Sequence, residues 1–164
     1  MAATATPYRS LSQDQRVALV QHVITSGKEG RALYIQRLAA KNGFRPVTLQ
    51  SWSAEKLARE VVRTRAETAQ DELNLLHLLY VELQPAIQIT FLDAAGVPHE
   101  NGVMKDELEP PYADADAVRR GAAAAHTQHG DDGMRYLRTL ARYSADGWPG
   151  IEERVAELEA EDAG

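Results

Sequence analysis

The chain has five histidines, the residue type with the widest chemical use: His22, His77, His99, His126 and His129. His126 and His129 are three residues apart, so on a helix they would share one face and could bind one metal ion. His99, in an acidic segment, could provide a third ligand. Gly130 would end a helix directly after the pair, and no compact His-Glu-x-x-His motif is present. The alternative is that the pair lies at a solvated helix end, where histidine is favourable to the helix dipole.

Carboxylates recur in close pairs: Glu107/Glu109, Asp114/Asp116 and Glu152/Glu153. Acid–base chemistry needs a carboxyl group that is buried beside a cleft with a raised pKa. These pairs fall in expected loops and helix starts, where capping and solubility explain them. The chain has no cysteine, which excludes disulfides, thiolate metal sites and cysteine nucleophiles. It also has no P-loop or Gly-x-Ser-x-Gly motif, so we expect no catalytic residue and no cofactor.

The acidic segment 106–112 could instead dock on a partner protein. Leu108 and Tyr112 would act as apolar anchors in a polar surround. Pro110 and Pro111 would stiffen the segment, which lowers the entropy lost on binding. With Trp148, these two anchors are the candidate partner-binding residues.

Charge is distributed unevenly along the chain. Residues 1–65 hold eleven Lys or Arg residues and four acids, a net charge of +7. Residues 66–164 hold seven basic residues and twenty acids, a net charge of −13. Clustered cations favour binding to phosphate backbones. The candidate nucleic-acid-binding residues are therefore Lys41, Arg45, Trp52, Lys56, Arg59 and Arg63.

The segment Leu38–Leu57 is expected to form a helix, a glycine, an extended loop and a second helix. On its glycine, its leucine positions and its Ser-x-x-x-Leu start, it resembles the small helix–loop–helix modules of the SAP and Rho N-terminal type. That resemblance implies nucleic-acid binding by the basic helix–loop–helix of residues 28–65, with Trp52 stacking on a base. The alternative is that the acidic part of the protein balances the basic face and that Trp52 packs between helices.

Capping signals predict where the first helices begin and end. Ser12 and Gln15 have the spacing of a capping box, and Gly27 ends the helix that follows. A second helix is expected from about residue 29 to 42, with Gly43 as its left-handed end. Residues 44–51 are expected to form a loop, and Ser53 caps the next helix.

The clearest helical periodicity lies in the middle of the chain. Apolar residues recur at steps of three and four: Ala69, Leu73, Leu76, Tyr80, Leu83, Ile87, Phe91 and Ala94. This pattern predicts a long central helix that Pro85 kinks or divides. The alternative is a short β-hairpin at 86–97, because Ile87–Phe91 alternates with period two. Further helices are expected at 114–127, at 132–143 after Gly130, and after Gly150.

Together these elements predict an all-α fold, a bundle of about six or seven helices. We expect a flexible N-terminus at 1–10, a single helical domain at 11–160 with a basic part (11–65) and an acidic part (66–160), and a frayed tail at 161–164. The start lacks a signal peptide, and the most apolar stretch, 73–92, is too polar for a membrane span. The sequence therefore predicts a cytoplasmic protein without membrane contact.

The favoured function is that of a helical protein–protein interaction protein, an adaptor or small subunit of an assembly without catalytic activity. Its partner would be another protein or a second copy of the chain, chosen by the two oppositely charged parts. One alternative is a nucleic-acid-associated protein that uses residues 28–65. The other is a metal-dependent helical enzyme that uses His99, His126 and His129.

Overall fold

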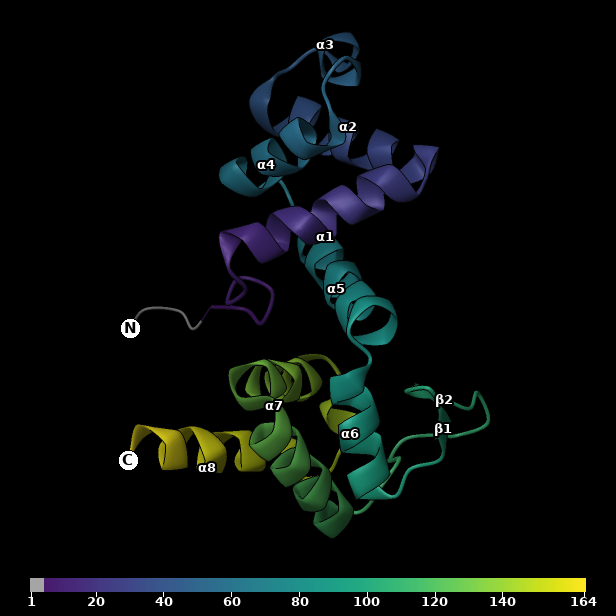
Figure 1. The fold of residues 1–164 in the computed structure, drawn as a ribbon, viewed down its shortest axis with the longest axis vertical. Helices are drawn as coiled ribbons and strands as arrows, with labels where there is room; N and C mark the ends of the chain where they lie inside the picture. The colour runs from purple at the N-terminus through teal and green to yellow at the C-terminus, as the bar shows by residue number, and fades with distance from the viewer. Residues whose placement is uncertain (1–4) are drawn as a thin grey trace. The chain divides into compact units, whose positions relative to one another are not determined.

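The computed structural model describes residues 5–164 and confirms the all-α fold (Figure 1). The α-helices in this part of the chain are α1 (Gln13–Ser26), α2 (Lys28–Asn42), α3 (Pro46–Gln50), α4 (Ala54–Thr64), α5 (Ala69–His77), α6 (Ala86–Ala95), α7 (Ala115–Tyr143) and α8 (Ile151–Ala163). The remaining elements are a π-helix η1 (Leu78–Leu83), a 3₁₀-helix η2 (Ala145–Gly147) and the strands β1 (His99–Glu100) and β2 (Val103–Met104). Helix α8 continues past residue 160, where the sequence predicted fraying.

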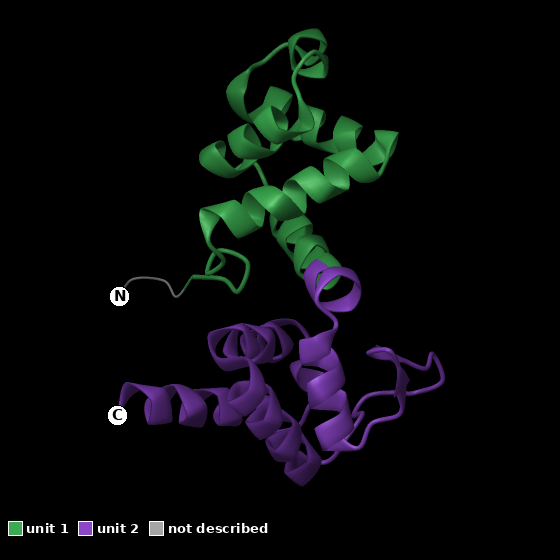
Figure 2. Ribbon diagram, in the orientation of Figure 1, with its two compact units in different colours: residues 1–78 green, residues 79–164 purple. Residues whose placement is uncertain are grey.

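The chain divides into two compact units, unit 1 (residues 1–78) and unit 2 (residues 79–164) (Figure 2). The boundary lies inside the segment expected to be one domain. Unit 1 has eleven basic and seven acidic residues, a net charge of +4, and unit 2 has seven basic and seventeen acidic residues, a net charge of −10. The opposite charges of the two sequence halves therefore persist in the two compact units.

Unit 1 is built from α1, α2 and α4, which pack on one another, with α3 against α2 (Figure 1). Its core is aliphatic, and the following side chains have no exposed surface: Val20, Leu38, Leu49, Leu57 and Val61. The predicted caps are confirmed. Ser12 and Gln15 form the capping box of α1, Gly43 ends α2 with φ 71°, and the Ser53 hydroxyl accepts a hydrogen bond from the Lys56 N–H.

The expected loop at 44–51 contains a short helix instead, so the helix–loop–helix prediction for residues 28–65 is corrected to three helices. Arg45 is extended, as a residue before proline must be. Pro46 then occupies the first helical position, where its fixed φ and missing N–H carry no penalty. Leu49 is fully buried and holds the turn against unit 1.

The segment before α1 also differs from the expected flexible N-terminus. Residues 1–4 lie outside the described part of the chain, but residues 7–10 form turns and Tyr8 has no exposed surface. Its hydroxyl donates a hydrogen bond of 2.6 Å to Glu67 Oε2. Tyr8 and Glu67 are far apart in the sequence, so no local sequence pattern predicts their contact.

The expected long helix at 69–95 is two α-helices with a π-helix between them. Helix α5 passes into η1, where the Gln84 N–H donates to the Leu79 carbonyl oxygen at 2.7 Å, a bond that spans five residues. Pro85 follows and serves as the N-cap of α6, because it has no N–H to continue the helical pattern. Proline therefore divides the helix rather than kinking it.

The alternative hairpin at 86–97 is wrong, since α6 covers that segment. A smaller hairpin follows it, with His99 opposite Met104 and Glu100 opposite Val103. Its turn is Asn101-Gly102, both with positive φ (52° and 89°). Asn-Gly is the preferred pair for a two-residue hairpin turn, a signal that the sequence analysis missed.

Unit 2 packs α6 and α8 against α7 (Figure 1). Gly130 interrupts α7 with φ 55° and ψ −128°, which confirms the predicted break between two helical segments. An aromatic group fills the core: Phe91, Tyr136 and Trp148 are at most 3% exposed, and Phe91 lies edge-on to both other rings at centroid distances of 5.7 and 5.0 Å. Among residues 5–164, no single helix is long and apolar enough to cross a membrane. The segments Ala69–Leu83 and Ala86–Ala95, which are bent relative to each other, meet this test of length and composition only when they are counted together.

Candidate interaction surface

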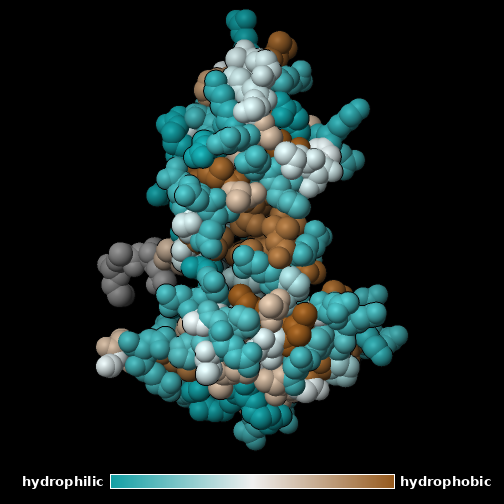
Figure 3. Space-filling view, viewed as in Figure 1, coloured by the Kyte–Doolittle hydropathy of each residue, from teal (hydrophilic) through white to brown (hydrophobic). Residues whose placement is uncertain are grey.

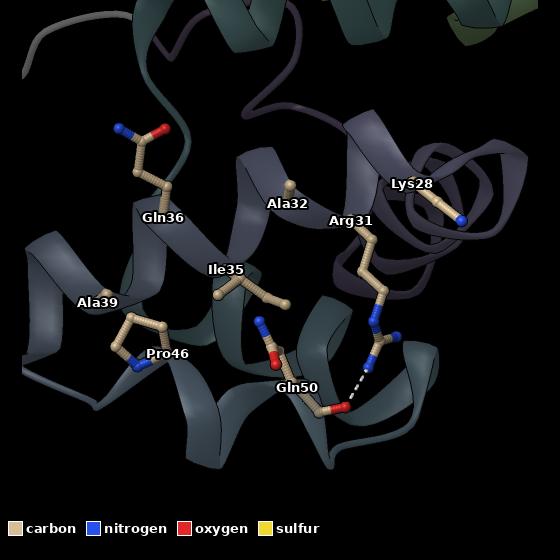
Figure 4. Close-up of a pocket in the computed structure, with 8 residues that line it drawn as sticks. All are labelled: Lys28, Arg31, Ala32, Ile35, Gln36, Ala39, Pro46 and Gln50. Atoms are coloured by element: carbon tan, nitrogen blue, oxygen red, sulfur yellow. Dashed lines mark hydrogen bonds between the residues drawn. The ribbon is translucent and has the colours of Figure 1, made fainter.

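An open groove of about 480 Å³ lies between α2 and α3 in unit 1 (Figure 4). Residues spaced along one face of α2 line one side, and Pro46 and Gln50 of α3 line the other. The apolar lining consists of Ala32, Ile35, Ala39 and Pro46, and the polar lining of Lys28, Arg31, Gln36 and Gln50. Small side chains on α2 leave the space open, so the groove has an apolar floor and a cationic end.

Arg31 holds the two walls of this groove together. One guanidinium nitrogen, Nη2, donates to the Gln50 carbonyl oxygen at 3.0 Å and to the Trp52 carbonyl oxygen at 2.6 Å (Figure 4 shows the bond to Gln50). Carbonyls at the end of a helix lack intrahelical partners, and a cation there is favourable to the helix dipole. Arg31 is therefore a structural side chain that also places positive charge at the groove.

Helix α3 carries one large hydrophobic side chain that is exposed. Val47, next to Pro46 in the sequence, is 78% exposed, more than any other large hydrophobic residue among those described. In the space-filling view the visible surface is mostly hydrophilic, and hydrophobic atoms project at the end of unit 1 where α3 lies (Figure 3). Val47 is a single exposed aliphatic side chain next in sequence to Pro46, which lines the groove.

A buried acidic cluster, defined by Glu67, Asp71 and Glu72, lies at the start of α5. Each of the three residues is at most 8% exposed. Arg9 lies 3.6 Å from Glu67 Oε1 and 3.4 Å from Glu72 Oε2, so one guanidinium is shared by two carboxylates. The hydroxyl of Thr6 donates to Glu72 Oε1 at 2.6 Å. The cluster therefore ties the segment before α1 to the start of α5.

Arg37 of α2 compensates the third carboxylate. Its Nε donates to Asp71 Oδ2 at 2.9 Å and its Nη2 to Oδ1 at 3.2 Å. Burial favours the neutral form of Asp71, but the hydrogen bonds from Arg37 and from Thr68 outweigh it, so the pKa of Asp71 is lowered. Nearby, burial and then the charge of Glu67 raise the pKa of Tyr8 well above its usual range. These charged groups interact with one another within unit 1 and stabilise its fold.

Ion pairs leave the surface of unit 1 strongly cationic. Five of its seven acids are in ion pairs, three of them in the buried cluster and the other two, Glu55 and Glu60, with Arg59 and Arg63. Within residues 5–78, seven cations and only two acids, Asp14 and Glu29, have no such pair. Those cations are Arg16, Lys28, Arg31, Lys41, Arg45, Lys56 and Arg65.

The candidate nucleic-acid residues fall into three groups. Lys56 lies over the Trp52 ring at 4.2 Å, and Phe44 packs edge-on to the same ring at 5.3 Å. Arg59 and Arg63 are held by carboxylates of α4, and the hydrogen bond from Arg63 lowers the pKa of Glu60. Lys41 and Arg45 are exposed. The structure thus brings Trp52 and Lys56 together and neutralises two of the six candidates.

The candidate partner-binding residues belong to unit 2. Trp148 is 2% exposed and packs in the aromatic core, so its ring is not available at the surface. Tyr112 packs on Trp148 at 5.2 Å, and its N–H donates to the Gly147 carbonyl oxygen at 3.0 Å. Leu108 is half-buried in a loop whose acids are exposed. Leu108 stays a candidate anchor of this acidic segment, whereas Tyr112 fixes the loop to unit 2.

The three candidate metal ligands have separate partners. His126 Nε2 lies 3.0 Å from both carboxylate oxygens of Asp162, and His129 Nε2 lies 2.9 Å from the Thr90 hydroxyl. His99 Nε2 lies 2.6 Å from Asp93 Oδ1. Among residues 5–164, no three His, Cys, Asp or Glu side chains are grouped so that they could hold a metal ion. The structure therefore does not assemble the proposed metal site.

The groove and the buried acidic cluster were missed by the sequence analysis. The groove had a partial signal, because Ala32, Ile35 and Ala39 share one helical face of α2. That signal does not show which element lies opposite, because α3 was expected to be a loop. The acidic cluster had no local signal, since Arg9 and Glu67 are 58 residues apart.

No family model matches the chain, and no curated protein and no solved structure is significantly similar to it. The resemblance to SAP and Rho N-terminal modules consequently depends on the quoted residues of Leu38–Leu57 alone. The short helix α3 inside that segment departs from the loop on which the resemblance was based.

Proposed function

We propose that this chain is a helical protein–protein interaction protein, an adaptor or small subunit, whose unit 1 binds an acidic partner protein through α2 and α3. The observation that carries the proposal is the pairing of charges in unit 1. Most acidic side chains of unit 1 form ion pairs, so its unpaired cations outnumber its unpaired acids. A cytoplasmic location, expected from the sequence, stays a prediction.

Electrostatics and apolar contact would have separate roles in this binding. The unpaired cations of unit 1 would attract and orient an acidic partner, which raises the association rate and is screened by salt. The groove and Val47 would provide apolar burial, the part of the affinity that salt does not weaken. Unit 2, with a net charge of −10, repels acidic proteins and so restricts them to unit 1.

A charge-reversed variant tests the proposal. Lys28→Glu with Arg45→Glu changes two exposed side chains without ion pairs, at the start of α2 and immediately before α3. Because carboxylates are favourable near helix N-termini, the variant should fold at least as well as the wild type. We call it the groove variant.

The wild-type chain and the groove variant are each immobilised and exposed to a nuclease-treated extract of the native cell. A captured protein is then purified and titrated against both. We expect an acidic partner that binds the groove variant at least about tenfold more weakly at low salt, a difference of roughly 1.4 kcal/mol. Equal affinity of the two chains for every purified partner would refute the proposal.

Nucleic acid is the second candidate partner, because the same cations are free and Lys56 lies beside Trp52. Its test is a titration of fluorescently labelled single-stranded DNA with the full chain at several salt concentrations. Binding that weakens steeply with salt and is lost in Arg45→Glu with Lys56→Glu supports nucleic acid. An unchanged anisotropy at low salt removes this candidate.

A further inference from the structure

Among the described residues, the groove between α2 and α3 is left open, with an apolar floor, a cationic end and a further cation beside its α3 wall. The groove is about 480 Å³ in volume and is lined by apolar side chains of Ala32, Ile35, Ala39 and Pro46. Lys28 and Arg31 lie toward one end of its α2 face, and Arg45 directly precedes Pro46 at the other wall. A segment that fits must combine an aliphatic side chain with flanking negative charges.

The same chain carries such a segment in unit 2. In the loop after β2, Leu108 is flanked by Asp106, Glu107 and Glu109, all of which are exposed, and the Leu108 N–H donates to the Lys105 carbonyl oxygen in a turn. Leu108 is half-buried, so part of its side chain is free for contact. None of these acids is in an ion pair within the described chain.

The loop is also held in place, which favours binding. Its far end is fixed by the Tyr112 N–H, which donates to the Gly147 carbonyl oxygen, and by the packing of the Tyr112 ring on Trp148. Two prolines precede Tyr112 and restrict the backbone between the acids and this anchor. A segment that is already restrained loses less entropy when it binds.

We propose that the groove between α2 and α3 receives the acidic loop 106–109 of a second copy of this chain, with Leu108 on the apolar floor. The inference rests on the proposed function, because it names an occupant of the same surface. Each copy has one groove and one loop, so two copies can exchange loops about a twofold axis or add head to tail. The contact is small, and we expect a dissociation constant in the micromolar to millimolar range.

Two complementary variants test the inference. The first is the groove variant, Lys28→Glu with Arg45→Glu, in which groove and loop are both acidic. The second, the loop variant, is Asp106→Lys with Glu107→Lys, in which groove and loop are both basic. All four substitutions are at exposed side chains, and circular dichroism checks that each chain folds.

Sedimentation equilibrium of the full chain at low salt measures the association. We expect wild-type chains to associate as their concentration rises from about 10 μM to 1 mM, and each variant alone to associate at least about tenfold more weakly. An equimolar mixture of the two variants restores one basic groove opposite an acidic loop and one acidic groove opposite a basic loop. The mixture should therefore associate about as well as the wild type, and Leu108→Ser should weaken association at all salt concentrations.

Three results would overturn the inference: a wild-type chain that stays monomeric up to about 1 mM, variants that associate like the wild type, or a mixture that associates no better than its components. Failure here is separable from failure of the proposed function. If the loop variant and Leu108→Ser bind the captured acidic partner normally while no chain self-associates, the proposed function stands and the second copy is excluded as the occupant.

Discussion

Replacing Gly121 with alanine should destabilise unit 2, although alanine is the better helix former. Gly121 lies in α7, which packs against α6. A Cβ atom added at Gly121 would lie 2.9 Å from Cδ2 and Cε2 of the Phe91 ring and 2.9 Å from the Phe91 carbonyl oxygen. These distances are well inside van der Waals contact, and Phe91 is fully buried with no space to retreat.

Two opposing terms decide the sign of the effect. Alanine in place of glycine in a helix interior contributes about 0.5–1 kcal/mol of stability. Overpacking a well-packed core by one methyl group costs about 1–3 kcal/mol. The overpacking term is larger, because one of the clashing atoms belongs to the backbone of α6. The expected loss is about 0.5–2 kcal/mol, or roughly 0.3–1 M in the urea midpoint of unit 2.

The chain offers a specific fluorescent reporter for this measurement. It has two tryptophans, Trp52 in unit 1 and Trp148 in unit 2. In a Trp52→Phe background, urea unfolding followed by fluorescence reports only on Trp148, whose ring lies 5.0 Å from that of Phe91. Unfolding of unit 2 is thereby measured without interference from unit 1.

A double-mutant cycle with Phe91→Leu identifies the contact responsible. In the Phe91→Leu background, Gly121→Ala should cost less, because the ring atoms are gone. The rescue should be partial, since the carbonyl oxygen of residue 91 stays in place. A midpoint that is unchanged or higher in Gly121→Ala alone would refute the close packing of α6 on α7, and a fully additive cycle would refute the role of Phe91.

Three further predictions concern unit 1 and are measured by urea unfolding in a Trp148→Phe background, with Trp52 as the reporter. Tyr8→Phe should cost about 1.5–3 kcal/mol because it removes a hydrogen bond to the buried Glu67 carboxylate; a loss below about 0.5 kcal/mol would contradict that burial. Asp71→Asn should cost about 1.5–3 kcal/mol at pH 7. The pKa of Asp71 is lowered by its hydrogen bonds, so its stabilisation is present above its unfolded pKa of about 3.9 and disappears as the pH falls through the folded value; a difference between Asp71→Asn and wild type that persists unchanged in strong acid would contradict the pairing with Arg37. Arg65→Gly should raise stability by about 0.5–1 kcal/mol because residue 65 has a left-handed φ of 54° at the end of α4, whereas Arg65→Ala should give no such gain.

The local signals in the sequence predicted most of the helix boundaries in the described chain. Helix caps and breaks form at the predicted residues, namely Ser12 with Gln15, Gly43, Ser53 and Gly130. Each works through a hydrogen bond or a φ angle within about four residues along the chain, so the sequence contains everything needed to locate it. The all-α class and the opposite charges of the two parts were predictable for the same reason.

Proline residues were less informative, because each is compatible with more than one local conformation. Pro85 predicted an interruption but left open whether it bends one helix or separates two, and the π-helix before it has no sequence signature in this chain. Pro46 is compatible with a loop and also with the first position of a helix. The burial of Leu49 selects the helix, and that burial depends on residues elsewhere in unit 1.

The helical class, the caps and breaks, and the unequal charge of this protein could be predicted from its sequence, because they depend on residue type and on neighbours along the chain. Which charges stay free and where a groove opens depend instead on how the chain folds. Arg9 and Arg37 form ion pairs with the buried acidic cluster at the start of α5, and α3 lies against α2 beside three small or aliphatic side chains. Ion pairing and packing act over a few ångströms in space between residues that are distant in sequence, so neither could be obtained from spacing along the chain.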